Sequence, residues 1–144
     1  MSHFSALSII GTWSVQSMVR ETGVGQRRHE FGSKPSGYIS YLPDGRMHAI
    51  LVADNRVHPA APVPTRDEQA RLFDTMIAYA GRYGVDGDCV VHDIEASWNE
   101  LWTGSRQKRS FAFDRDNLAR TAAAGASPRD GREGRSIVTL KKVR

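Results

Sequence analysis

His92 is the residue of this sequence best suited to move a proton. Its segment reads "VVHDIEASW" (residues 90–98), in which apolar and polar residues alternate. Side chains of a strand point alternately to its two faces, so one face is predicted to be buried. That face carries Val90, His92, Ile94, Ala96 and Trp98. Burial disfavours the charged form of the imidazole. Such a histidine could act as an acid or base near neutral pH. It could also be a structural histidine that orients a tyrosine.

Arg109 is predicted to bring a positive charge into the same interior. In "QKRSFAF" (residues 107–113) it alternates onto one face with Gln107, Phe111 and Phe113. A buried guanidinium requires a carboxylate or an anionic ligand oxygen. We therefore expect Arg109 either to anchor a ligand carboxylate, phenolate or enolate, or to pair with Asp93 or Glu95.

Aromatic side chains with polar tips accompany these two segments. They suit an apolar pocket with a few directed hydrogen bonds, and each of them also suits core or rim packing. Tyr38 and Tyr41 lie on opposite faces of one predicted strand, so only one of them can line the interior. Trp98 and Trp102, in "SWNELWTG", are expected at the lip of the pocket. The expected ligand-binding residues are Tyr38, Tyr41, Tyr83, Ile94, Trp98, Trp102 and Phe111.

Neither a metal site nor a nucleophilic cysteine is predicted. The histidines lack the short spacings of metal ligands, and Cys89, the only cysteine, falls on the face opposite His92. A lone cysteine fits a reducing compartment. The N-terminal segment has neither the basic start of a signal peptide nor an apolar stretch of membrane-spanning length. We expect a cytoplasmic protein that uses no cofactor and contacts no membrane.

Turn signals divide the chain into short strands that must position these residues. "PDGR" (residues 43–46), "DGD" (86–88) and "DRDN" (114–117) each separate two strand-like segments, and the last strand is predicted at residues 136–143. The first strand begins with "GTWSVQSMVRE", in which Trp13, Val15, Ser17 and Val19 share the predicted buried face.

One helix interrupts this pattern, over residues 65–79. Thr65 and Glu68 form a capping-box signature, and Leu72, Phe73, Met76 and Ile77 fall on one helical face. A single helix cannot cover a long sheet on both faces, so the eight or nine strands are expected to close into a barrel. Trp13 is then expected to seal one end of that barrel.

Several ordered motifs resemble one family. Gly11-Thr12-Trp13 matches a Gly-x-Trp signature, and Gly-Tyr-x-x-Tyr, Pro-Asp-Gly-Arg-Met, Tyr-x-Val-Asp-Gly-Asp and Val-Val-His follow in order. Together they resemble the bacterial and fungal lipocalin-like domain family, of calycin type, over about residues 7–118. The length of the chain indicates one domain over residues 1–144. The resemblance implies a closed up-and-down antiparallel β-barrel with a cavity for a small, largely apolar molecule. It implies structural roles for Gly11 and Trp13, with Lys141, Lys142 or Arg144 packed over the tryptophan.

The net charge does not change this prediction of fold and function. The chain carries +4, concentrated in residues 101–144, and the basic stretch at residues 129–135 has the composition of a turn. No nucleic-acid-binding motif accompanies it, so a nucleic-acid or acidic-partner adaptor is the least favoured class.

The preferred hypothesis is a monomeric or homodimeric protein that binds a small apolar or aromatic metabolite, as an accessory of a small-molecule pathway. The alternative is a cofactor-independent isomerase, cyclase or (de)hydratase, with His92 as acid/base and Arg109 or a tyrosine stabilising negative charge on oxygen.

Overall fold

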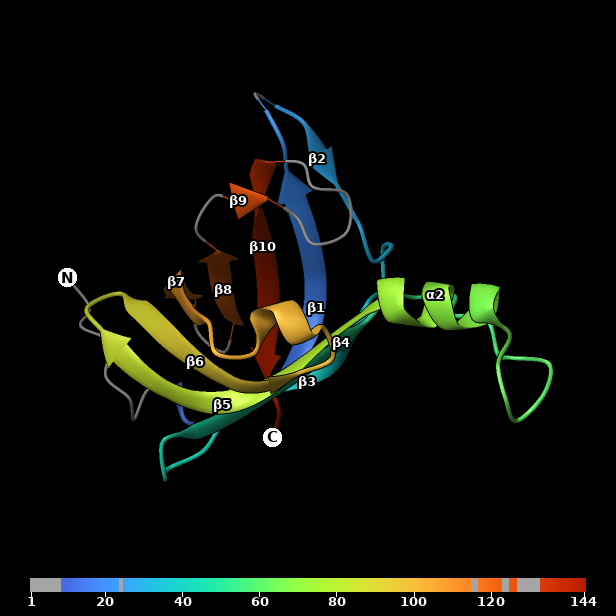
Figure 1. Ribbon diagram of the computed structural model, residues 1–144. Helices are drawn as coiled ribbons and strands as arrows, with labels where there is room; N and C mark the ends of the chain where they lie inside the picture. Colours follow the sequence, from blue (N-terminus) through green and yellow to red (C-terminus); the bar gives the residue numbers. More distant parts are fainter. Residues whose placement is uncertain (1–8, 24, 115–116, 123–124, 127–132) are drawn as a thin grey trace.

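The computed structural model describes residues 9–23, 25–114, 117–122, 125–126 and 133–144. The strands are β1 (Gly11–Glu21), β2 (Arg27–Arg28), β3 (Ser36–Tyr41), β4 (Arg46–Val52), β5 (Met76–Asp86), β6 (Cys89–Ser97), β7 (Arg106–Asp114), β8 (Asn117–Ala122), β9 (Gly125–Ala126) and β10 (Glu133–Lys142). The helix α2 (Arg66–Asp74) lies between β4 and β5, and the 3-10 helix η1 (Glu100–Trp102) lies between β6 and β7. Figure 1 shows their arrangement.

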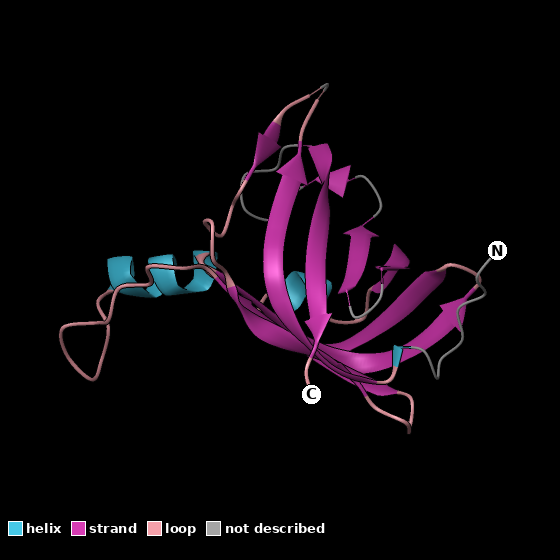
Figure 2. Cartoon of the chain, turned by 180° about the vertical axis from the view of Figure 1, so that it is seen from behind, coloured by secondary structure: helices cyan, strands magenta, loops and turns pink. Residues whose placement is uncertain are grey.

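The sheet closes on itself, as predicted. Within the described residues, eight strands follow one another in the order β1-β3-β4-β5-β6-β7-β8-β10, each antiparallel to the next. The ring closes where β1 pairs with β10, from Trp13 opposite Lys142 to Glu21 opposite Arg135. The two-residue strands β2 and β9 add to the far ends of β1 and β10 (Figures 1 and 2). Closure pairs the edges that an open sheet would leave free.

The predicted hairpins join the strands of this ring. Residues 43–46 lead from β3 to β4, with Gly45 at φ 87°, and residues 86–88 lead from β5 to β6, with Gly87 at φ 63°. The third turn joins β7 to β8, although residues 115–116 within it lie outside the described residues. The last strand starts at Glu133, three residues earlier than predicted, and most of the basic stretch at residues 129–135 also lies outside the described residues.

The helix begins as predicted but ends five residues early. Thr65 accepts a hydrogen bond from the backbone N–H of Glu68, and the Glu68 side chain accepts one from the backbone N–H of Thr65. Residues 76–82 instead form part of β5 and pair with β4. If these residues were helical, the backbone groups of β4 on this side would have no partner strand. Within α2 no residue is buried, and the helix extends away from the barrel wall (Figures 1 and 2).

A β-bulge changes the predicted faces of β1. Its register against β10 shifts between Val15 and Ser17, so the residues that follow exchange faces. Met18 and Arg20 therefore lie inside, in place of the predicted Ser17 and Val19. Arg20 forms an ion pair with Glu30, with Nε 3.7 Å from Oε1, and both side chains are largely buried.

Trp13 lies at the end of the barrel where β1 begins, which we call the Trp13 end. Its indole N–H donates to the carbonyl of Ile9 at 2.9 Å. Of the three basic candidates, Lys142 lies over the ring, with Nζ 5.0 Å from the ring centroid, and Nζ donates to the carbonyl of Ile10 at 2.6 Å. A Cβ at Gly11 would lie 2.7 Å from that Nζ, so the glycine makes room for the lysine.

Each of the eight strands of the ring contributes at least one buried apolar side chain to the core in the barrel interior. None of the helices in the described part of the chain has the length and hydropathy that crossing a membrane requires.

Candidate functional site

The inward face of β6 carries the histidine. Val90, His92 and Ile94 are buried, as the alternation predicted. The set ends there, because the pairing with β5 shifts between Ala80 and Gly81 and leaves Glu95 as an extra residue. Ala96 is consequently exposed and Trp98 leaves the interior face, which corrects the prediction for these two residues.

His92 is completely buried between two tyrosines. Its Nε2 lies 2.8 Å from the hydroxyl of Tyr41 on β3, and its Nδ1 lies 3.2 Å from the hydroxyl of Tyr79 on β5. A neutral imidazole has one N–H donor and one acceptor nitrogen, so it donates to one tyrosine and accepts from the other. Because β3 does not pair with β6, the contact with Tyr41 spans the interior. The arrangement satisfies both ring nitrogens with protein groups.

Tyr79 was not among the expected site residues. The helix predicted over residues 65–79 ends with Tyr79, whereas in the strand β5 this residue shares the inward face with Gly81 and Tyr83. The alternation Tyr-x-Gly-x-Tyr over residues 79–83 is the sequence signal that indicates this position.

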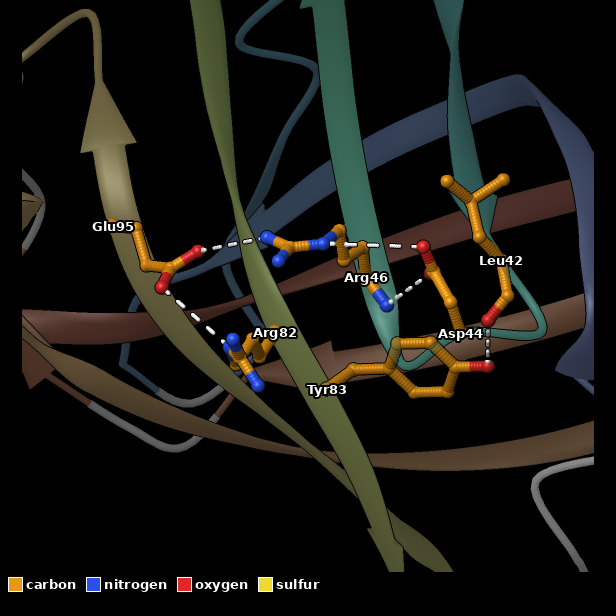
Figure 3. Close-up of polar contacts among 6 residues, drawn as sticks. All are labelled: Leu42, Asp44, Arg46, Arg82, Tyr83 and Glu95. Carbon is orange, nitrogen blue, oxygen red and sulfur yellow. Dashed lines mark hydrogen bonds and ion pairs between the residues drawn. The ribbon is translucent and has the colours of Figure 1, made fainter.

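Tyr83 is also held by the protein. Its hydroxyl donates to the carbonyl of Leu42 at 2.8 Å (Figure 3). Its ring packs edge-on against Tyr41, with 4.9 Å between the ring centroids. Burial, and then the nearby Asp44 carboxylate, raise the pKa of the Tyr83 hydroxyl. Tyr83 is therefore a neutral donor that links β5 to the turn between β3 and β4.

On the outer face of the same strands, Glu95 links two arginines. Arg46 and Arg82 lie directly opposite each other on β4 and β5, where two like charges repel. One carboxylate oxygen of Glu95 lies 3.8 Å from Arg46 and the other 3.7 Å from Arg82 (Figure 3). The bulge places Glu95 outside, so it cannot pair with a residue of the interior.

Arg109 lies on the inward face of β7, opposite Val90. Its Nη2 donates to the side-chain carbonyl of Gln107. Its Nε is buried and meets no hydrogen-bond acceptor among the described residues. The protein partners considered from the sequence are engaged elsewhere: Asp93 accepts from Arg106 at 2.7 Å, and Glu95 faces Arg46 and Arg82. The predicted alternative of an Asp93 or Glu95 pair is therefore wrong, because both carboxylates lie outside.

The remaining aromatic residues divide between the interior and its rim. Ile94 and Phe111 are buried inside, whereas Tyr38 is 51% exposed on the outer face of β3 and does not belong to the interior set. Trp98 packs against Phe73 of α2 and donates from its indole N–H to the Phe73 carbonyl at 3.2 Å. Trp102 of η1 lies between Trp98 and Tyr79, with ring centroids 5.1 and 5.6 Å away.

The interior has two unlike walls. His92, Gln107 and Arg109 lie on the adjacent strands β6 and β7, with His92 directly opposite Gln107. The strands β10, β1, β3 and β4 on the other side of the ring contribute buried apolar side chains: Trp13, Val15, Met18, Ile39, Met47, Ala49, Leu51, Val138 and Leu140. The first wall also carries buried apolar side chains, and the second also carries Arg20 and Tyr41, so the walls differ in their share of polar groups.

Metal and thiol chemistry find no support in the described residues. They contain no group of three or more His, Cys, Asp or Glu side chains placed to hold a metal ion. Burial, and then the neighbouring Asp88, raise the pKa of the Cys89 thiol, which disfavours the nucleophilic thiolate.

Comparisons with known proteins agree with this architecture. The family model of a lipocalin-like domain matches residues 10–143, which is nearly the whole chain. A search of curated proteins finds no significant match.

Proposed function

This chain belongs to the lipocalin-like domain family, and on that premise we propose that its barrel interior binds a small, largely apolar or aromatic molecule. The observation that carries the proposal is the pairing of an apolar wall on β10, β1, β3 and β4 with polar side chains on β6 and β7. Small-molecule sites combine apolar surface with a few oriented polar groups in the same way. In the cell, such a protein would serve as an accessory of a small-molecule pathway.

The aromatic side chains around η1 support entry from the η1 end, opposite the Trp13 end. At the Trp13 end, Trp13, Tyr41 and Leu140 are almost completely buried. Ile77 and Trp102, toward the η1 end, retain partial exposure, as do Tyr83 and Phe113 toward the Trp13 end. The aromatic rim of Phe73, Trp98 and Trp102 would flank an entering molecule.

Apolar burial alone does not account for tight binding. An aromatic ligand that buries about 150 Å² gains about 4 kcal/mol, which corresponds to a dissociation constant of about 1 mM. Tighter binding requires directed contacts. We expect them from Arg109 and Gln107 of the polar wall, because tyrosine hydroxyls already satisfy both ring nitrogens of His92.

Binding is tested with a neutral fluorescent probe, N-phenyl-1-naphthylamine, which brightens in apolar surroundings. We expect saturable binding at one probe per chain. Ala49→Phe fills the interior and is expected to weaken binding strongly, whereas Ile50→Phe, on the outer face of the same strand, is the matched control. Circular dichroism checks that both variants fold. Non-saturable binding to the unmodified protein, or equal loss in the two variants, would contradict the proposal.

The alternative function is a cofactor-independent isomerase, cyclase or (de)hydratase. It is favoured by one observation, the contact of both imidazole nitrogens of His92 with tyrosine hydroxyls. By exchanging tautomers, such an imidazole can pass a proton from one hydroxyl to the other. The same contacts also satisfy the histidine completely, which is why we rank binding first.

His92→Ala separates the two functions. Native mass spectrometry identifies the small molecule that co-purifies, and chromatography then compares that molecule before and after incubation with the protein. A carrier releases it unchanged, and the variant shifts only its affinity. An enzyme converts it, and the variant stops conversion while folding and binding are largely preserved.

A further inference from the structure

Arg109 is an interior group with a side-chain donor that meets no acceptor among the described residues. Its Nε is buried without an acceptor among the described residues, and its Nη2 donates to the side-chain carbonyl of Gln107. The Arg109 side chain is partly buried, and a guanidinium keeps its positive charge in proteins. Burial of that charge costs free energy unless an anion or acceptor compensates it.

The acidic side chains of the neighbouring strands do not supply that compensation. Asp93 pairs with Arg106, and Asp86 pairs with Lys108, at 2.7 and 3.4 Å on the outer face. Glu30, which is nearly buried, lies against Arg20 of β1. Among the described residues, no carboxylate lies within ion-pair distance of Arg109.

The guanidinium is held in place from the η1 side. Gln107, which accepts from Arg109, donates from its Nε2 to the Ser105 hydroxyl at 3.4 Å. Ser105 in turn donates to the carbonyl of Trp102 at 2.6 Å. This chain of hydrogen bonds connects Arg109 to the rim, so its free donor is oriented before any ligand arrives. Such pre-organisation reduces the entropic cost of binding.

We propose that the ligand of this barrel is an apolar carboxylic acid whose carboxylate accepts a hydrogen bond from Arg109 Nε. The proposal rests on the proposed function and adds the chemical class of the ligand. A carboxylic acid is favoured over a phenol because it is already ionised at neutral pH, whereas a phenol titrates near pH 10. A carboxylate thus compensates the guanidinium without a further cost of deprotonation.

The test compares two probes that differ in charge and share one ring system, 2-anthracenecarboxylate and its methyl ester. Fluorescence titrations are carried out with the unmodified protein and with Arg109→Met and Lys108→Met. Lys108, the residue before Arg109, lies on the outer face of β7. Lys108→Met therefore removes one positive charge without changing the interior. A hydrogen bond to a charged group predicts a loss of about 10- to 100-fold in carboxylate affinity for Arg109→Met. The ester is expected to bind all three proteins within about twofold.

The outcomes distinguish the inference from the proposed function. The inference is wrong if Arg109→Met keeps its affinity for the carboxylate, or if Lys108→Met loses as much of that affinity as Arg109→Met. Binding in the barrel still stands in either case, provided that the ester binds. If neither probe binds the unmodified protein, the proposed function fails and the inference fails with it.

A second comparison covers the case in which Arg109→Met does not fold. Arg109→Lys keeps a cation and is expected to retain a preference for the carboxylate over the ester, whereas Arg109→Gln is expected to lose it. Equal preferences in these two variants would overturn the inference.

Discussion

The Nε2 atom of His92 and the hydroxyl of Tyr41 lie 2.8 Å apart inside the barrel, and both side chains have no exposed surface. Because their strands, β6 and β3, do not pair, this contact joins two sides of the ring.

Tyr41→Phe is expected to destabilise the protein by about 1–3 kcal/mol, because it removes the hydroxyl that faces a buried imidazole nitrogen. Urea denaturation measures the change. Tyr38→Phe, three residues earlier and on the outer face, is the control and is expected to stay within about 0.5 kcal/mol. Equal effects of the two changes would show that the contact with His92 adds nothing to stability.

Gly81→Ala is expected to cost about 1–3 kcal/mol, the range of overpacked sites. A Cβ at Gly81 would lie 1.9 Å from the backbone carbonyl oxygen of Asp93, at the bulge that places Glu95 outside. Gly84, on the same strand, has open space around a Cβ, so Gly84→Ala is the matched control. Thermal unfolding of the two variants tests this, and comparable melting temperatures would contradict it.

Lys142→Met is expected to lower stability by about 1–2 kcal/mol and to shift the tryptophan fluorescence of the protein. The change removes a cation 5.0 Å from the Trp13 ring centroid and a donor to the Ile10 carbonyl, while methionine preserves most of the packing. Lys141→Met, one residue earlier and exposed, provides the comparison. If both variants unfold alike, the lysine over Trp13 is not a stabilising contact.

Glu21 is expected to contribute to the loss of stability in acid. The hydrogen bond from Arg135 is the largest cause that holds the pKa of its carboxyl below the ordinary value, and Arg27 acts in the same direction. A carboxyl whose pKa is lower in the folded than in the unfolded state stabilises the fold above its unfolded pKa. That contribution disappears as the pH falls through the folded pKa.

The corresponding measurement is the melting temperature between pH 7 and pH 3. Glu21→Gln is expected to lower it at neutral pH and to flatten its decline below about pH 4, where glutamates titrate. Glu133→Gln, an exposed residue of β10, should leave the profile unchanged. An identical acid decline in the unmodified protein and Glu21→Gln would contradict the assignment.

The local pattern of the sequence predicted much of this protein. Alternation placed Val90, His92 and Ile94 on one buried face and carried Arg109 inward with Phe111, because the two faces of a strand follow from the backbone geometry of each residue. The capping box at Thr65 and the turns at residues 43–46 and 86–88 also depend on neighbours along the chain. Closure was expected because an open sheet of this length would leave edges unpaired.

Only the tertiary structure decided which polar groups meet. The bulge between Val15 and Ser17 exchanges the two faces of β1 partway along the strand and brings Arg20 inside. The bulge opposite Gly81 acts on β6 and leaves Glu95 outside. The pairing of β5 with β4 ends the helix early and turns Tyr79 toward His92. Register and bulges are set by partner strands distant in the sequence, so local periodicity does not specify them.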